Sequence, residues 1–237
     1  EVLQSAEVGD KLKMAGVLDI SNGADAIVAS KDINSIEDLK GKRVYVESTA
    51  LGNYLIKRSM DFAQNISIKD VEVSTVELGK HLKDFKDKKV DAVVTFEPYL
   101  TQLLDEGAHV LFDSTQIPQE IVDVMVTNNE TLLSREEALK ELINGWYRTL
   151  DYINSNKKVA MAEMAVYEYI SPEDFEAAYD KLIIPSRSES VDMLGKDKGA
   201  FKTALQRLSE LMYEKGSLKT EVDTIPLVDS RLIKESK

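Results

Sequence analysis

The sequence predicts an α/β fold. From Arg43 to Phe112, short β-branched runs alternate with segments of helical period, as where RVYVE precedes a helix that begins at about Leu51. Strands that alternate with helices usually form a parallel sheet covered on both faces. After IVDVMVT (Ile121 to Thr127) strands nearly stop and helical patterns take over. We therefore expect a second, mainly helical region to begin there.

The first region should contain a parallel sheet with helices on both faces. Its predicted strands lie near residues 43 to 47, 71 to 76, 91 to 96 and 109 to 112. Each intervening helix has one apolar stripe to bury, made of Leu51, Tyr54, Leu55 and Phe62 in the first and of Leu78, Leu82 and Phe85 in the second. A third helix is predicted from Pro98.

The second region should consist of amphipathic helices. Apolar side chains recur three and four residues apart at Leu139, Leu142, Ile143, Trp146, Tyr147, Leu150 and Ile153. Ser171-Pro172 has the form of a helix start, and another helix should contain Phe201, Leu205, Leu208 and Met212. The sheet that these helices cover is expected to come from DAIVAS (Asp25 to Ser30), from IVDVMVT and from residues before Glu1.

Composition excludes several functions. The 237 residues are 43% hydrophobic, enough for folded cores. A net charge of -12 disfavours binding to nucleic acid, and no apolar run reaches the roughly eighteen residues of a membrane span. Cysteine is absent, and His81 and His109 have no partner at metal-ligand spacing. We expect no disulfide, no structural metal and no cofactor.

Four ordered blocks of sequence resemble a known family. They are VLDISNGADAIVA (Val17 to Ala29), INSIEDLKGKRVYVE (Ile33 to Glu47), VDAVVTFEPYLTQLLDEG (Val90 to Gly107) and VLFDSTQIPQEIVDVMV (Val110 to Val126). In these blocks the chain resembles the NMT1/THI5-like substrate-binding proteins of ABC importers. That family serves nitrate, sulfonate, taurine, bicarbonate and thiamine-precursor compounds, and it has relatives in pyrimidine synthesis.

The resemblance implies a two-lobe, periplasmic-binding-protein-like (type II) fold whose lobes are joined by two crossing strands. Residues 1-29 would be a remnant of the first lobe and the first hinge strand, and residues 30-120 the second α/β lobe. Residues 121-237 would be the return hinge strand and the C-terminal helices of the first lobe. DAIVAS and IVDVMVT are then the crossing strands. A full member would carry roughly another 60 to 80 residues before Glu1, so the first lobe is expected to be incomplete here.

The resemblance also implies a function. The chain would capture a small polar solute, anionic or zwitterionic, and deliver it to the membrane permease of an ABC transporter. It would do so in the periplasm or otherwise outside the cytoplasm, and a removed N-terminus could have carried a lipid anchor. Two alternatives are the ligand-sensing domain of a membrane receptor and an enzyme of pyrimidine synthesis. Against the enzyme stands the lack of cysteine and of a well-placed histidine.

The first candidate ligand-binding residues follow the strand RVYVE. Ser48, Thr49 and Gly52 lie where a strand ends and a helix begins, so hydroxyls and backbone amides can bind an anion there. Either hydroxyl could equally be a helix cap.

Glu97 and Tyr99 follow the strand DAVVTF at the carboxyl edge of the predicted sheet. A carboxylate at this position suits a ligand that is cationic or rich in donors. The alternatives are that Glu97 caps its helix and that Tyr99 only packs.

Further candidates lie at the predicted crossing strands. Ser21, Asn22 and Asp25 surround a glycine-containing turn, and Asp123 lies within IVDVMVT. The alternative for Asp123 is a hydrogen bond to the backbone across the crossing strands that stabilises the hinge.

Overall fold

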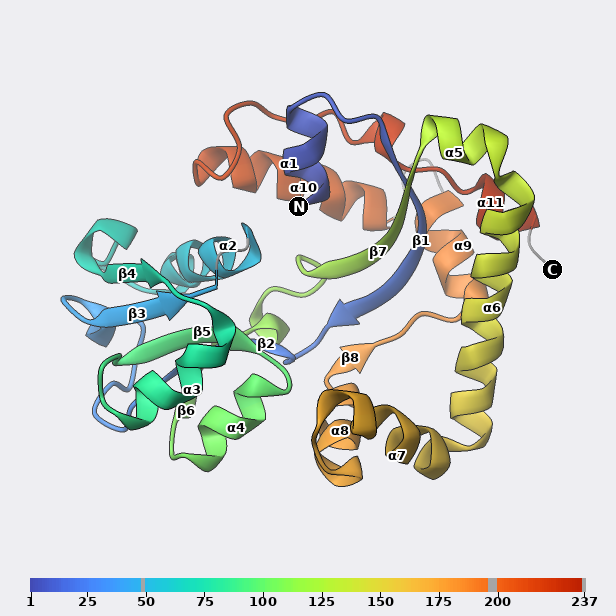
Figure 1. Cartoon of the computed structure of the whole chain (residues 1–237). Helices are drawn as coiled ribbons and strands as arrows, with labels where there is room; N and C mark the ends of the chain where they lie inside the picture. Colours follow the sequence, from blue (N-terminus) through green and yellow to red (C-terminus); the bar gives the residue numbers. More distant parts are fainter. Residues whose placement is uncertain (48–49, 196–199, 236–237) are drawn as a thin grey trace. The chain divides into compact units, whose positions relative to one another are not determined.

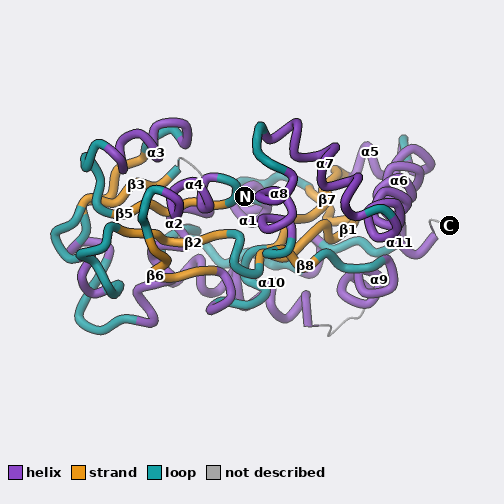
Figure 2. The backbone as a smooth tube through the Cα atoms, turned by 90° about the horizontal axis from the view of Figure 1, so that it is seen from below, coloured by secondary structure: helices purple, strands orange, loops and turns teal. Residues whose placement is uncertain are grey.

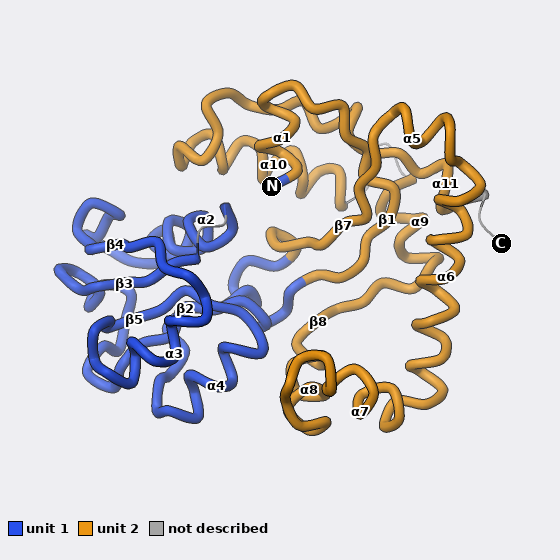
Figure 3. The backbone as a smooth tube through the Cα atoms, viewed as in Figure 1, with its two compact units in different colours: residues 1, 21–118 blue, residues 2–20, 119–237 orange. Residues whose placement is uncertain are grey.

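The computed structural model describes residues 1–47, 50–195 and 200–235 (Figure 1). The chain divides into two compact units (Figure 3). Unit 1 comprises residues 21–118 together with Glu1, and unit 2 comprises residues 2–20 and 119–237. Apart from Glu1, the chain therefore passes from unit 2 into unit 1 once, after Ile20, and returns once, after Pro118. Strands gather into two sheets, and helices make up most of the rest (Figure 2).

Unit 1 is built on a five-stranded sheet with the order β4-β3-β5-β2-β6. Its strands are β2 (Asp25–Ala29), β3 (Arg43–Val46), β4 (Glu72–Thr75), β5 (Ala92–Phe96) and β6 (His109–Asp113). Strand β3 pairs parallel with β4 and β5, whereas β2 pairs antiparallel with β5 and β6. The four strands predicted for this region are confirmed.

Strand β2 corrects the predicted topology. We expected DAIVAS to be a strand that crosses between the two lobes, but β2 lies inside the sheet of unit 1, which is consequently mixed rather than parallel. All five residues of β2 are buried. A strand that is apolar on both faces is stable only where both faces are covered. Strand β2 lies between β5 and β6, in the interior of a sheet that has helices on both faces.

Helices cover both faces of the unit 1 sheet. They are α2 (Ala50–Ser59), α3 (Leu78–Lys86) and α4 (Tyr99–Asp105). Leu82 of α3 and Leu100 of α4 belong to one cluster with Val93 and Tyr45. Gly52 of α2 instead approaches Val46, whose side chain alternates with that of Tyr45 along β3. Helix α2 therefore covers the opposite face, as the sequence predicted.

Unit 2 contains a three-stranded sheet with the order β7-β1-β8. Its strands are β1 (Leu12–Ser21), β7 (Val122–Asn128) and β8 (Leu182–Ile183). The antiparallel partner of β7 is β1, a strand that the sequence reading did not identify. Register irregularities between Met14 and Gly16 and between Val17 and Asp19 interrupt the alternation of side chains along β1. Four consecutive residues of β1, beginning at Met14, are buried.

Helices form the rest of unit 2. They are α1 (Val2–Glu7), α5 (Asn129–Ser134), α6 (Glu136–Ser155), α7 (Lys157–Glu168), α8 (Pro172–Tyr179), α9 (Arg187–Gly195), α10 (Ala200–Glu214) and α11 (Arg231–Glu235). Ser171 caps α8, because its hydroxyl accepts the backbone N–H of Asp174 at 3.0 Å. The predicted apolar stripe of α10 is confirmed at Phe201, Leu205 and Met212, which are buried.

Short 3-10 turns connect several elements, at Glu37–Leu39, Met60–Phe62, Ile68–Asp70, Ser114–Gln116 and Ile225–Leu227. Within the residues that the structure describes, no helix is both long enough and apolar enough to cross a membrane.

Candidate functional site

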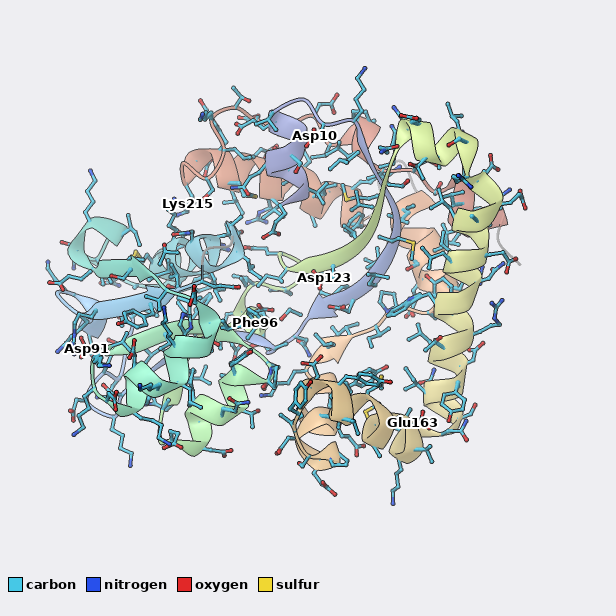
Figure 4. All side chains as sticks on the ribbon, in the orientation of Figure 1. Asp10, Asp91, Phe96, Asp123, Glu163 and Lys215 are labelled. Carbon is cyan, nitrogen blue, oxygen red and sulfur yellow. The ribbon has the colours of Figure 1, made fainter. Side chains whose placement is uncertain are left out.

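A notch at one edge of the unit 1 sheet brings several candidate residues together. Parallel strands β3 and β5 end at this edge, and antiparallel β2 begins there, with Asp25 paired to Phe96. Figure 4 labels Phe96, which marks the place. The notch is lined by Asp25, Glu47, Leu51, Gly52, Leu55, Val94, Thr95 and Phe96. The carboxyl edge of an open α/β sheet is where such folds place ligands.

Asp25 stands at the start of β2 and is only 7% exposed. The turn before it is held by hydroxyl groups. The Ser21 hydroxyl accepts the backbone N–H of Asp25 at 3.2 Å and lies 2.7 Å from the Ser114 hydroxyl. Ser114 also accepts the backbone N–H of Gly23 at 2.7 Å. These contacts hold Ser21 against the start of β2, and the predicted roles of Ser21 and Asp25 in ligand binding stay predictions.

The candidates Asn22 and Gly52 have different surroundings. Asn22 is exposed and precedes Gly23, whose positive φ of 101° suits glycine. Gly52 allows α2 to approach the end of β3, since a Cβ there would lie 3.4 Å from the carbonyl oxygen of Glu47. Its place in the notch wall is therefore a matter of close packing. Ser48 and Thr49 lie outside the described residues.

Thr95 is a notch residue that the sequence reading missed. It is 3% exposed, and its hydroxyl has no hydrogen-bond partner among the described residues. Buried hydroxyls are nearly always paired, so such an atom in a native structure calls for an explanation. The signal in the sequence was a single hydroxyl residue in the apolar strand AVVTF, directly before Phe96 and Glu97.

Glu97 makes the contacts of a helix cap. Its carboxylate accepts the backbone N–H of Thr101 at 3.1 Å and the Thr101 hydroxyl at 3.0 Å. The Glu97–Pro98 peptide bond is cis. Tyr99 packs edge-on against Phe96, with the ring centroids 6.2 Å apart. The capping and packing alternatives thus have observed contacts, while the ligand-binding roles of both residues stay predictions.

Asp123 is not among the residues of the notch. It lies on β7 in unit 2, where its side chain is exposed (Figure 4). Its position pairs with Asp19 of β1 in the antiparallel ladder. Its predicted role in ligand binding stays a prediction.

The histidines do not supply chemistry to the notch. His81 is fully buried, and its Nε2 lies 3.0 Å from the carbonyl oxygen of Val76. Burial lowers the pKa of His81, so the ring is neutral at physiological pH. Across the described residues, no group of three or more His, Asp and Glu side chains is arranged to hold a metal ion.

The notch has a volume of only about 10 Å³, room for no more than about one water, but its residues offer polar groups at the sheet edge. Two carboxylates, from Asp25 and Glu47, and the hydroxyl of Thr95 are acceptors for hydrogen bonds, and Leu51 and Phe96 provide apolar surface. No cationic side chain belongs to the described lining. Such an arrangement favours binding of a molecule that donates hydrogen bonds.

Comparison with known proteins gives a consistent result. The family model described as NMT1/THI5 like matches residues 2–160. Proteins of Brucella abortus strain 2308 and Brucella suis biovar 1, each named "Putative binding protein", are 21% identical over 206 residues. These matches cover 84% of this chain but 63% of each relative. The chain therefore spans less than two thirds of the length of these curated relatives.

Solved structures share the fold. The alkanesulfonate-binding protein SsuA of Xanthomonas axonopodis pv. citri, bound to MOPS, superposes with a TM-score of 0.78 at 16% identity, covering 97% of this chain and 77% of that one. The periplasmic aliphatic sulphonate binding protein SsuA of Escherichia coli gives 0.78 at 17% identity, covering 99% and 78%. The desulfurization enzyme DSZB gives 0.71 at 12% identity, covering 99% and 82%. These likenesses show the type II periplasmic-binding-protein fold.

Proposed function

The chain belongs to the NMT1/THI5-like family, and from that premise we propose that it is a solute-binding protein that captures a small polar molecule for an ABC importer. The observation that carries the proposal is the notch of unit 1. A buried carboxylate, Asp25, and a buried hydroxyl without a partner, Thr95, lie at the sheet edge where such folds bind ligands.

The solute of this proposal is a zwitterion or a polar molecule with several hydrogen-bond donors. Two neighbours in fold are named for binding alkanesulfonate and aliphatic sulphonate, which supports an anionic group. The carboxylates of Asp25 and Glu47 would repel a simple anion that approached them. A solute with a donor or cationic group on one side and an anionic group on the other satisfies both considerations.

The proposal includes a place of action and a partner. The protein works outside the cytoplasm, as the periplasmic binding protein of Escherichia coli named above does. Its partner is the membrane permease of an ABC transporter. An acidic surface, with a net charge of -12 over the chain, suits a soluble carrier that avoids nucleic acid.

Binding without chemical conversion is the form of the proposal that the residues favour. The fold is shared with a desulfurization enzyme, so the fold alone does not decide the matter. The chain contains no cysteine for a thiolate nucleophile. Of its two histidines, His81 is buried against Val76.

A thermal-shift screen tests the proposal. The chain is heated with sulfonates, nitrate, bicarbonate, amino acids and pyrimidines in turn, because a solute that binds only the folded state raises the melting temperature. A solute present at a hundred times its Kd should add about 2.7 kcal/mol to the free energy of unfolding. We expect one compound class to stabilise the protein and to be recovered unchanged. Recovery of a converted product would refute binding without conversion.

A further inference from the structure

The turn between β1 and β2 contains Asn22 followed by Gly23. An asparagine before a glycine is open to deamidation, because glycine has no Cβ to shield its backbone nitrogen from the neighbouring side-chain amide. Asparagine is accordingly less frequent in proteins adapted to high temperature. The chain has a second such pair, Asn144 followed by Gly145. The two pairs have the same local sequence, but the fold gives them opposite surroundings.

Asn22 has the surroundings that favour the reaction. Its side chain is exposed, and it lies between the last residue of β1, Ser21, and the first residue of β2, Asp25. Gly23 has a φ of 101°, a conformation that glycine adopts without strain. The side-chain amide of Asn22 is therefore open to water, and its peptide bond to Gly23 belongs to neither a helix nor a strand.

The nitrogen that would attack Asn22 is held by a buried hydroxyl. The backbone N–H of Gly23 donates to Oγ of Ser114 at 2.7 Å. Ser114 is fully buried, and its hydroxyl lies 2.7 Å from that of Ser21. A nitrogen that donates its hydrogen in this way must give up the bond before it can lose the proton, and breaking such a bond costs free energy. Reaction in the folded chain therefore requires a local opening of the turn.

Asn144 is protected on both sides of the reaction. It lies in the interior of α6 and is only 7% exposed. Its Oδ1 accepts from Nη2 of Arg187 at 2.9 Å. In the interior of an α-helix the backbone N–H of a residue such as Gly145 donates to the carbonyl four residues earlier. Asn144 can therefore react only when the helix opens, which makes it an internal reference for the state of the fold.

We propose that Asn22 is a site of spontaneous deamidation and that Ser114 slows the reaction. The nitrogen of Gly23 loses its proton to a base in solution and bonds to Cγ of Asn22, while the side-chain nitrogen takes a proton from water and leaves as ammonia. Water then opens the cyclic imide to aspartate or isoaspartate. Each event places a carboxylate shortly before Asp25, whatever solute the notch of unit 1 binds.

Peptide mapping of the whole chain, kept at pH 8, tests the site. Trypsin places three asparagines in separate peptides, each as the single asparagine of its peptide: Asn22 in residues 14–31, Asn65 in residues 59–69 and Asn144 in residues 141–148. Asn65 is exposed but precedes Ile66, whose branched side chain crowds the backbone. Mass spectrometry should show conversion of Asn22 severalfold faster than that of Asn65 and Asn144. Conversion of Asn22 as slow as that of Asn144 would overturn the proposal.

Two comparisons test the role of Ser114. A synthetic peptide of residues 14–31 lacks Ser114 and should convert severalfold faster than the same residues in the whole chain. Ser114→Ala in the whole chain should speed conversion of Asn22 and leave Asn144 unchanged. Ser21→Ala is the matched control, because it loosens the same turn but keeps the acceptor of the Gly23 N–H, and it should act less strongly.

Three results would overturn that role. They are equal rates in the peptide and the whole chain, an unchanged rate at Asn22 in Ser114→Ala, and equal acceleration at Asn22 and Asn144 in that variant, which would indicate general unfolding.

Discussion

Asp19 of β1 and Asp123 of β7 occupy directly paired positions of the antiparallel ladder in unit 2. Asp123 is exposed and Asp19 is half-buried. Like charges at paired positions of neighbouring strands destabilise a sheet. The pair therefore gives Asp123 a measurable energetic role that does not depend on any ligand.

Asp123→Asn is expected to raise the free energy of unfolding by a few tenths of a kcal/mol, because it removes repulsion from Asp19. Urea denaturation at low ionic strength measures the effect, and added salt should reduce it. Glu163→Gln on exposed α7 is the matched control. A loss of stability in Asp123→Asn would instead support the alternative that the carboxylate holds the backbone of the two strands.

Thr95→Val tests whether the buried hydroxyl serves the solute. The substitution keeps the shape of the side chain and removes a polar atom that has no partner among the described residues. The unliganded protein should be equally stable or more stable by up to about 1 kcal/mol. Its melting temperature should no longer rise with the solute found by the thermal-shift screen. An unchanged response to that solute would exclude Thr95 from the binding site.

Substitutions at Glu97 and Thr101 can distinguish the helix-capping role of Glu97 from a role in ligand binding. Glu97→Ala removes both acceptors of Thr101 and should cost about 1 kcal/mol of stability. Glu97→Gln keeps one acceptor and should melt within a few degrees of the parent. If the charge contacts solute, Glu97→Gln nevertheless loses the solute response. Thr101→Val, which removes one capping contact alone, should retain that response.

Acid should weaken the ion pair between Arg43, the first residue of β3, and Asp91, which directly precedes β5. Arg43 donates to the carboxylate of Asp91 from Nε at 3.0 Å and from Nη2 at 2.8 Å, and this hydrogen bonding lowers the pKa of Asp91. A lowered pKa in the folded state contributes stability that is present above the unfolded value, about 3.9, and is lost as pH falls through the folded value.

Unfolding midpoints measured from pH 7 to pH 3 check this effect. Asp91→Asn should melt a few degrees lower than the parent at pH 7, and the two curves should converge at the acid end. The same substitution at exposed Asp32 should leave the curve of the parent unchanged. Parallel curves for Asp91→Asn and the parent would contradict the assignment.

His81 should make stability depend on pH near neutrality. Burial lowers the pKa of its ring in the folded state, so the unfolded chain binds more protons as pH falls below about 6.5. The free energy of unfolding should therefore decrease between pH 7.5 and pH 5.5. His81→Met should flatten this part of the curve, while His109→Met provides the comparison with the other histidine. A slope that survives in His81→Met would contradict the prediction.

Much of the local structure followed from the sequence. Strands β3 to β6 and helices α2 to α4 could be predicted because apolar residues repeat with periods of two or about 3.6 over a few turns. The start of α8 could be predicted because Ser171 and Pro172 act on the helix beside them. The family relationship, carried by four ordered blocks, likewise depended on residues that lie close together along the chain.

The tertiary structure decided which distant residues meet. The place of DAIVA between β5 and β6 depends on cover for both of its faces, and β1 was hidden because its irregular register breaks the period of two. The hydroxyl of Thr95 is unusual only because its surroundings leave it buried without a partner. Arg187 meets Asn144 across 43 positions of sequence. Periodicity is a property of neighbours, whereas strand order and pocket walls arise from contacts whose spacing along the chain follows no rule.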